Sequence, residues 1–211
     1  PGFHVTPRYL ADYDAHIARM ISLAQGEEKR CAALIEQLRP LARLLEDKRD
    51  VLSERVIHGD PKAANFLFAA EGDAAISLID LDTVKPGLLL HDLGDCLRSC
   101  CNPLGEGHDD IAAIRFMPEL FTALMRGYLE QASDLLNSMD RSLLVSAAAV
   151  ISFELGLRFF SDHLAGNHYF TITWPGQNLH RALVQLQLCQ SILGQQQQLE
   201  AEFRALLGQA R

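Results

Sequence analysis

The sequence has no excess of basic residues and no basic cluster. Its 27 Asp and Glu residues outnumber its 19 Lys and Arg residues, so the formal net charge is −8 at pH 7. Proteins bind nucleic acid through basic patches, and the composition therefore argues against such a surface. No run of about 18 apolar residues is evident, and no basic segment leads into an apolar one. We expect neither a membrane span nor a signal peptide.

Cysteine is present in an odd number and in no regular framework, as five residues. Cys96, Cys100 and Cys101 lie near His91, but their spacing matches no zinc pattern. Residues 90–101 are instead typical of a helix on which small thiols pack. These features indicate a reducing compartment, the cytoplasm.

No internal repeat and no linker rich in Pro, Gly or Ser divides the chain. Its 211 residues suit one domain with a sizeable core, and 48% hydrophobic and 22% charged residues are typical of globular proteins. We therefore predict a single domain of residues 1–211.

Apolar residues at helical spacing dominate the chain. Thr6 and Pro7 are expected as N-cap and first residue of a helix that Gly26 stops. Short β-type runs predict strands at 54–58, 66–68 and 75–79, and Lys85-Pro86-Gly87 predicts a break. The expected class is α+β, mainly α, with two small β-ribbons. Further helices are expected at 27–38, 41–52, 90–101, 116–130, 141–164 and from 177 to the end.

One stretch carries candidate chemistry: His58-Gly59-Asp60-Pro61-Lys62-Ala63-Ala64-Asn65, followed by Ile79-Asp80-Leu81-Asp82. Asp60 and Asn65 are five positions apart, and Asp80 follows where strand, turn and strand can bring it back. Attack of a hydroxyl on the γ-phosphate of ATP needs a carboxylate base, metal ligands and a cation, and Asp60, Asn65, Asp80 and Lys62 have these types. Oxygen ligands of this kind suit Mg²⁺. The alternative is a plain turn, since Gly, Asp and Pro favour turns, but two halves in order and spacing favour a site.

These residues resemble the catalytic core of the aminoglycoside phosphotransferase and choline kinase superfamily, which are relatives of protein kinases. The segments 79–87 (IDLDTVKPG), 158–162 (RFFSD) and 178–182 (NLHRA) most resemble its N-acetylhexosamine kinase branch. The resemblance implies the C-terminal lobe of a protein-kinase-like fold that uses ATP and Mg²⁺. It makes Asp60 the catalytic base and Lys62 a catalytic phosphate contact. Lys62, Asn65 and Asp80 would bind the nucleotide, the last two as metal ligands.

The same resemblance assigns roles to residues around this core. His58, Asp82 and Asp92 would support it, with Asp92 hydrogen-bonded to the catalytic-loop backbone. Arg158, Asp162 and Tyr169 would contact a sugar substrate. Other interpretations stay open, because Glu154, Arg158 and Asp162 at i,i+4 steps also suit a surface ion ladder, and Tyr169 lies in an aromatic run typical of a core.

The sequence lacks the Gly-rich hairpin and strand lysine that cover ATP phosphates in kinases. Its one G-x-G, Gly105-Glu106-Gly107, is followed by acids that would repel phosphate. We therefore expect the N-terminal ATP-grasping lobe to lie outside this chain and the isolated chain to be folded but nearly inactive. An apolar face near the catalytic loop would then be open to a partner lobe or to homodimerisation. The alternatives are a non-catalytic kinase-like binding lobe, a metal-dependent phosphohydrolase, and a kinase for choline or an aminoglycoside.

Overall fold

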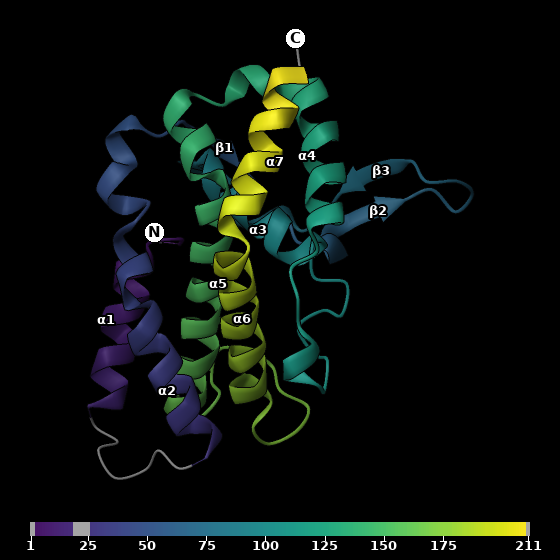
Figure 1. Ribbon diagram of the computed structural model, residues 1–211. Helices are drawn as coiled ribbons and strands as arrows, with labels where there is room; N and C mark the ends of the chain where they lie inside the picture. Colours follow the sequence, from purple (N-terminus) through teal and green to yellow (C-terminus); the bar gives the residue numbers. More distant parts are fainter. Residues whose placement is uncertain (1–2, 19–25, 210–211) are drawn as a thin grey trace.

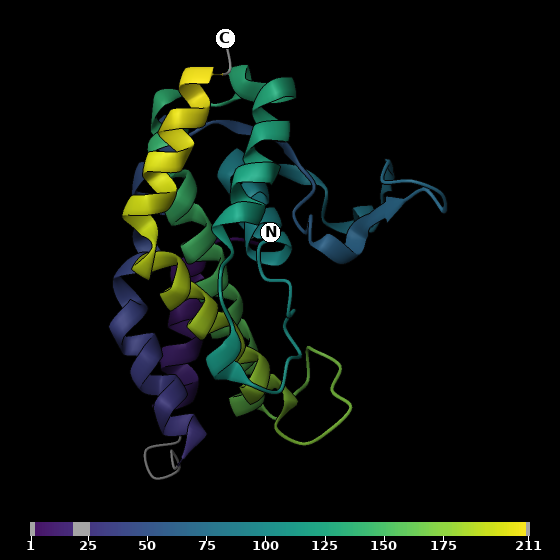
Figure 2. The ribbon, with the colours of Figure 1, turned by 45° about the vertical axis from the view of Figure 1, so that its right-hand side comes forward.

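The computed structural model describes residues 3–18 and 26–209 and is mainly helical (Figures 1 and 2). Two long antiparallel helices lie side by side in its centre, α5 (Ser138–Ala165) and α6 (Gln177–Gly194). The other helices pack around this pair: α1 (Thr6–Ile17) and α3 (Leu89–Cys100) contact α5, α2 (Glu27–Leu38) contacts α6, and α4 (Pro118–Ala132) packs against α7 (Gln196–Gln209).

The central helix α5 is buried along most of its length. Asn137 and Asp140 form a capping box at its start, and Gly166 ends it in the left-handed conformation, with φ of 97°. By length and composition alone, α5 is long and apolar enough to cross a membrane. Our reading of the sequence had not identified this helix as a candidate span. However, 83% of its apolar window is buried inside the protein, as in the core helix of a globular domain.

Four short strands form two separate antiparallel ribbons. The strand β1 (Glu54–Ile57) pairs with β4 (Lys85–Leu88), and β2 (Phe66–Phe68) pairs with β3 (Ala75–Leu78) in a hairpin that projects from the helical body (Figure 1). The predicted class, mainly helical α+β with two small ribbons, is confirmed. The predicted break at 85–87 is wrong, because these residues pair with β1. Pro86 is tolerated there since β4 is an edge strand.

Some helix predictions also need correction. Residues 41–52 form no α-helix but two 3₁₀ segments, Arg39–Arg43 and Glu46–Val51. The helix predicted from 177 onward is broken at Gln195, whose side chain bonds the Phe116 carbonyl oxygen at 3.1 Å. The part of the first predicted helix beyond residue 18 lies outside the described residues.

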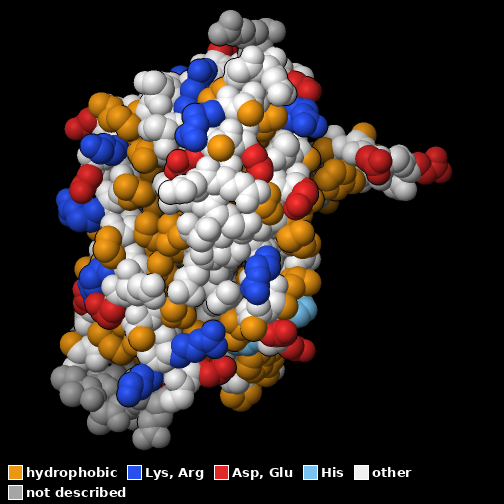
Figure 3. Space-filling view, viewed as in Figure 1, with side chains coloured by type: hydrophobic (Ala, Val, Ile, Leu, Met, Phe, Trp, Pro, Cys, Tyr) orange, Lys and Arg blue, Asp and Glu red, His pale blue; other side chains and the backbone are white. Residues whose placement is uncertain are grey.

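Large apolar side chains are exposed on and beside the two ribbons. Val56 is 76% exposed, Ile76 65% and Phe68 59%. Figure 3 shows apolar side chains at the base of the projecting hairpin. These side chains form exposed apolar surface on the strands that flank residues 58–65, where an apolar face was expected.

Candidate active site

The loop at residues 58–65, called the catalytic loop below, connects β1 to β2. The backbone N–H groups of His58 and Gly59 donate to the two carboxylate oxygens of Asp92, at 2.7 and 2.8 Å. Asp92 lies in the first turn of α3, so the loop is fixed to that helix. These are the hydrogen bonds that the sequence analysis expected of Asp92.

Gly59 is required by the loop's backbone. Its φ is +87°, and a Cβ there would lie 2.8 Å from the Thr83 carbonyl oxygen. The Thr83 hydroxyl also donates to the His58 carbonyl oxygen at 2.7 Å. A residue with a side chain would therefore be strained and would collide with backbone. This contact of Thr83 with the loop joins residues 25 positions apart, so no local sequence pattern predicts it.

His58 connects the catalytic loop to the end of β3. Its Nε2 lies 2.9 Å from the Ile79 carbonyl oxygen, which can only accept, so Nε2 donates. Its Nδ1 accepts from the Asp60 N–H at 3.3 Å. The ring therefore holds Asp60 and the residue before Asp80 in a fixed relation, which agrees with the supporting position expected for His58.

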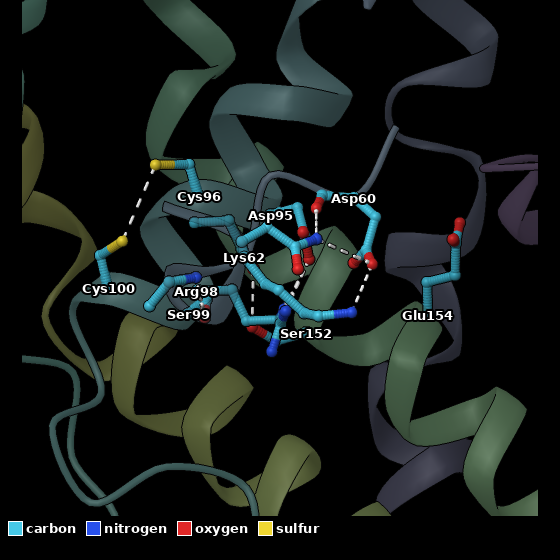
Figure 4. Close-up of polar contacts among 12 residues, drawn as sticks. Asp60, Lys62, Asp95, Cys96, Arg98, Ser99, Cys100, Ser152 and Glu154 are labelled. Atoms are coloured by element: carbon cyan, nitrogen blue, oxygen red, sulfur yellow. Dashed lines mark hydrogen bonds and ion pairs between the residues drawn. The ribbon is translucent and has the colours of Figure 1, made fainter. Parts of the chain in front are cut away.

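The four residues of the predicted chemistry come together at this point. The Lys62 Nζ lies 2.5 Å from an Asp60 carboxylate oxygen (Figure 4) and 3.9 Å from an Asp80 carboxylate oxygen. The Asn65 amide donates to the Asp60 carbonyl oxygen at 2.8 Å. Asp80 has a left-handed backbone, φ 67° and ψ 59°, a conformation that is uncommon for residues other than Gly, although Asp and Asn adopt it more readily than most.

The donor set suits a magnesium ion that is shared with a nucleotide. Because the Asn65 Nδ2 donates within the loop, the Asn65 Oδ1 remains as an oxygen that could bind a metal. Over residues 3–18 and 26–209, no group of three His, Cys, Asp or Glu side chains could hold a metal on its own. Mg²⁺ commonly binds through one or two protein ligands and takes its remaining ligands from phosphates and water. Asn65 and Asp80 fit that pattern.

Asp82, expected beside them, is exposed and forms no hydrogen bond within the described part of the chain. The structure therefore shows no contact through which Asp82 would support the site.

A cavity of about 760 Å³ opens beside the catalytic loop, between α3, α5, α6 and the loop after α5. Four acids line it, and each is paired with a cation: Asp60 with Lys62, Asp95 with Arg98, Glu154 with His4, and Glu106 with Arg181.

Arg158 also lines the cavity but has no ion pair within residues 3–18 and 26–209. Its guanidinium lies 5.0 to 5.7 Å from the ring centroids of Phe3, Tyr9, Tyr169 and Phe170. This is cation–π geometry, which orients the side chain and leaves its N–H groups free.

The ion ladder considered for α5 is wrong. Glu154 is 1% exposed and bonds His4, while Asp162 accepts from the backbone N–H groups of residues 168, 169 and 170 at 2.8 to 2.9 Å. The Asn178 amide donates to Asp162 as well, at 2.9 Å. Asp162 thus anchors the loop after α5 and is not among the residues that line the cavity. That loop carries Tyr169, which lines the cavity and is 72% exposed, so it is no core residue.

His4 is a buried residue of the site that sequence reasoning missed. Its Nδ1 lies 2.8 Å from a Glu154 oxygen, and its Nε2 lies 2.8 Å from the Gly59 carbonyl oxygen. Burial alone would lower the pKa of His4, but the hydrogen bond and charge of Glu154, together with the Gly59 carbonyl and the charge of Asp95, outweigh burial and raise the pKa. The expected N-cap Thr6 is inside the helix, where its hydroxyl donates to Glu154 at 2.7 Å. Both contacts span about 150 residues, which no local pattern reveals.

A sequence model of a known family covers the catalytic loop and its supports. The model of the phosphotransferase enzyme family (APH) matches residues 2–140, more than half of the chain. The matched range contains Asp60, Lys62, Asn65, Asp80 and Asp92. The helical domain with two small ribbons is consistent with the C-terminal lobe of a protein-kinase-like fold. The chain belongs to the phosphotransferase enzyme family.

Proposed function

We propose that this chain takes part in the ATP- and Mg²⁺-dependent transfer of a phosphoryl group to a hydroxyl of a small neutral molecule, a sugar of the N-acetylhexosamine type. One observation carries the proposal. Asp60 lies on the wall of a cavity of about 760 Å³, with the Lys62 ammonium between it and Asp80. A base, a cation and a metal ligand in one place are the parts that phosphoryl transfer needs.

Asp60 accepts the proton of the attacking hydroxyl as the oxygen forms its bond to the γ-phosphorus. The bond from that phosphorus to the bridging oxygen of ADP breaks, and its electron pair leaves with ADP. Lys62 supplies positive charge to the phosphoryl oxygens while this happens. Asn65 and Asp80 would hold the metal, which supplies charge neutralisation to the phosphates when bound. Asp92 and His58 keep the Asp60 carboxylate in place through the backbone.

The paired acids of the cavity favour a neutral acceptor over a cationic one. An aminoglycoside or choline would need carboxylates whose charge is not already balanced, yet each of the four acids that line the cavity is paired with a basic side chain. Breaking a buried pair such as Asp95–Arg98 would leave an uncompensated charge, which is strongly destabilising. Arg158, by contrast, has free N–H groups that could donate to a carbonyl oxygen, such as that of an acetamido group. These features support an N-acetylhexosamine.

The test is ATP-dependent phosphorylation of N-acetylglucosamine and N-acetylgalactosamine, with choline and an aminoglycoside as comparison substrates. It should be run on the 211-residue chain and on the full product of its reading frame, since a Gly-rich phosphate loop is not among these residues. Asp60→Asn should lower turnover by roughly 100-fold or more, while Mg-ATP affinity stays similar. Asp73→Asn, in the exposed turn of the β2–β3 hairpin, is the matched control.

Near-normal turnover of Asp60→Asn would contradict the role of the base. Turnover with choline or the aminoglycoside alone would overturn the neutral acceptor but leave phosphoryl transfer standing. Asp80→Ala should separately abolish Mg-dependent nucleotide binding, because few protein ligands hold the metal. Calorimetry that showed unchanged Mg-ATP affinity in this variant would contradict the metal assignment.

A further inference from the structure

Three buried oxygens without hydrogen-bond partners belong to residues that line the same cavity. They are Asp95 Oδ2, Asn102 Oδ1 and Gln185 Oε1, and their residues are 5%, 5% and 1% exposed. None has a partner within the part of the chain that the structure describes. Buried polar atoms are almost always hydrogen-bonded, because an unpaired one loses its bonds to water and gains nothing in exchange. Three such atoms around one cavity indicate that a ligand completes them.

The surroundings of each oxygen explain why it is left free. Arg98 directs both of its contacts to Asp95 Oδ1, from Nε at 2.8 Å and from Nη2 at 2.7 Å, so Oδ2 stays unpaired. The Asn102 Nδ2 donates to the Gly105 carbonyl oxygen at 3.2 Å, which identifies Oδ1 as the free atom of this amide. Gln185 lies on α6, and its side chain forms no hydrogen bond within residues 3–18 and 26–209.

We infer that Asp95, Asn102 and Gln185 recognise the acceptor substrate, Asp95 and Asn102 by accepting hydrogen bonds from its hydroxyl or amide N–H groups and Gln185 through its side-chain amide. The inference rests on the proposed function and deepens it, because it names the chemistry of the acceptor. The free oxygens of Asp95 and Asn102 can only accept, so they need a ligand that donates at more than one point, while the Gln185 amide can accept or donate. A sugar with several hydroxyl groups fits this need. A phosphate or carboxylate group would be repelled, and the quaternary ammonium of choline has no N–H to offer.

If Gln185 binds the acceptor, replacing it should change protein stability and sugar affinity in opposite directions. Replacing Gln185 by methionine keeps the length of the side chain and removes an unpaired buried oxygen. The melting temperature should therefore stay the same or rise. Affinity for the sugar should nevertheless fall, because a hydroxyl of the ligand would lose its hydrogen-bond partner. A purely structural glutamine would show the reverse, with lower stability and unchanged binding.

The experiment is a titration of N-acetylglucosamine and N-acetylgalactosamine into the 211-residue chain, without ATP or Mg²⁺, followed by calorimetry. Gln185→Met and Asn102→Leu should each weaken binding of at least one of the two sugars by about 10-fold or more, which equals about 1.4 kcal/mol. The matched control is Tyr128→Phe. It also removes a buried oxygen without a partner among the described residues, but Tyr128 does not line this cavity, so sugar affinity should not change.

A second measurement needs no variant and therefore does not depend on how a variant folds. The 3-deoxy, 4-deoxy and 6-deoxy forms of N-acetylglucosamine are titrated into the unaltered chain, and at least one should bind about 10-fold more weakly. In Gln185→Met, the penalty for the deoxy form that lacks Gln185's partner hydroxyl should disappear.

Equal affinity for all deoxy forms, or no saturable binding of any of these sugars, would overturn the inference. So would unchanged sugar affinity in both Gln185→Met and Asn102→Leu. Turnover in the kinase assay without discrimination among deoxy sugars would leave the proposed function intact and remove this inference alone. If the chain discriminated among deoxy sugars in binding but neither chain phosphorylated a sugar, the inference would stand and the proposed function would be contradicted.

Discussion

Replacing Asp92 by asparagine should loosen the catalytic loop while the helical core remains folded. The two Asp92 oxygens accept from the backbone N–H groups of His58 and Gly59, at 2.7 and 2.8 Å. Asparagine keeps one acceptor oxygen but places an NH₂ group against the other N–H donor. One charge-assisted hydrogen bond is lost and the remaining one becomes neutral.

The magnitude follows from two opposing effects. Hydrogen bonds to a charged group contribute about 1.5–3 kcal/mol each, so the lost bond and the weakened one together cost about 2–4 kcal/mol. Burial, however, raises the pKa of Asp92 despite these bonds, which shows that the ionised carboxylate is costly to bury. A neutral asparagine avoids that cost, and we therefore expect the lower end, about 2 kcal/mol, or roughly 30-fold in an opening equilibrium.

Hydrogen exchange followed by NMR measures this directly at two amides. The His58 and Gly59 N–H groups should exchange roughly 30-fold faster in Asp92→Asn, while amides in α5 and α6 keep their protection. Asp82→Asn is the control, because Asp82 is exposed and has no hydrogen bond within the described residues. If both loop amides of Asp92→Asn exchanged at wild-type rates, Asp92 would not be what fixes the loop.

Three further outcomes are expected. Burial lowers the pKa of His91 to about 2, so the unfolded chain takes up a proton near pH 6.5 that the folded chain does not. This histidine therefore costs about 2 kcal/mol of stability between pH 7.5 and pH 5. Urea unfolding of His91→Leu should show that this acid penalty has gone, and an unchanged pH slope would contradict the assignment. Gly94→Ala should lower stability by about 1–3 kcal/mol, because its Cβ would lie 2.8 Å from a backbone oxygen of α5. Gly127→Ala, with no atom within 4 Å of its Cβ, should instead gain about 0.5–1 kcal/mol in thermal unfolding, and equal effects of the two would refute the packing argument. Replacing the exposed Phe68 and Ile76 by serine should reduce dye binding and self-association without loss of stability, and a large loss would mean that these side chains are not free.

The parts of the site that could be predicted are those that depend on short stretches of sequence. Asp60 and Asn65 are five residues apart in one loop, and Asp80 follows one hairpin later, so spacing alone places them together. The bond from Asp92 to the catalytic loop was expected from the family resemblance, because an acid in a first helical turn by itself indicates only a capping role. Strands β1, β2 and β3 were predicted to within one residue at each end.

The parts that could not be predicted depend on contacts distant in the sequence. Lys85-Pro86-Gly87 has the composition of a turn, and only pairing with β1 makes it a strand. His4 and Thr6 bond Glu154 across about 150 residues, so a local rule assigned Thr6 to a helix cap. At the break at Gln195, the side chain of that residue bonds the Phe116 carbonyl oxygen, a contact across 79 residues.

The three charged residues of α5 show how such contacts build a site. Glu154, Arg158 and Asp162 are spaced for ion pairs with one another, yet each interacts with a different segment. Glu154 bonds His4, which in turn contacts the Gly59 carbonyl oxygen of the catalytic loop. Arg158 lies against aromatic rings at the cavity, and Asp162 holds the loop that carries Tyr169. One face of a core helix thus connects the N-terminal segment, the candidate base and the far wall of the cavity. Substituting Asp162, which does not line the cavity, should therefore shift Tyr169 relative to Asp60 without touching either the acceptor or the base.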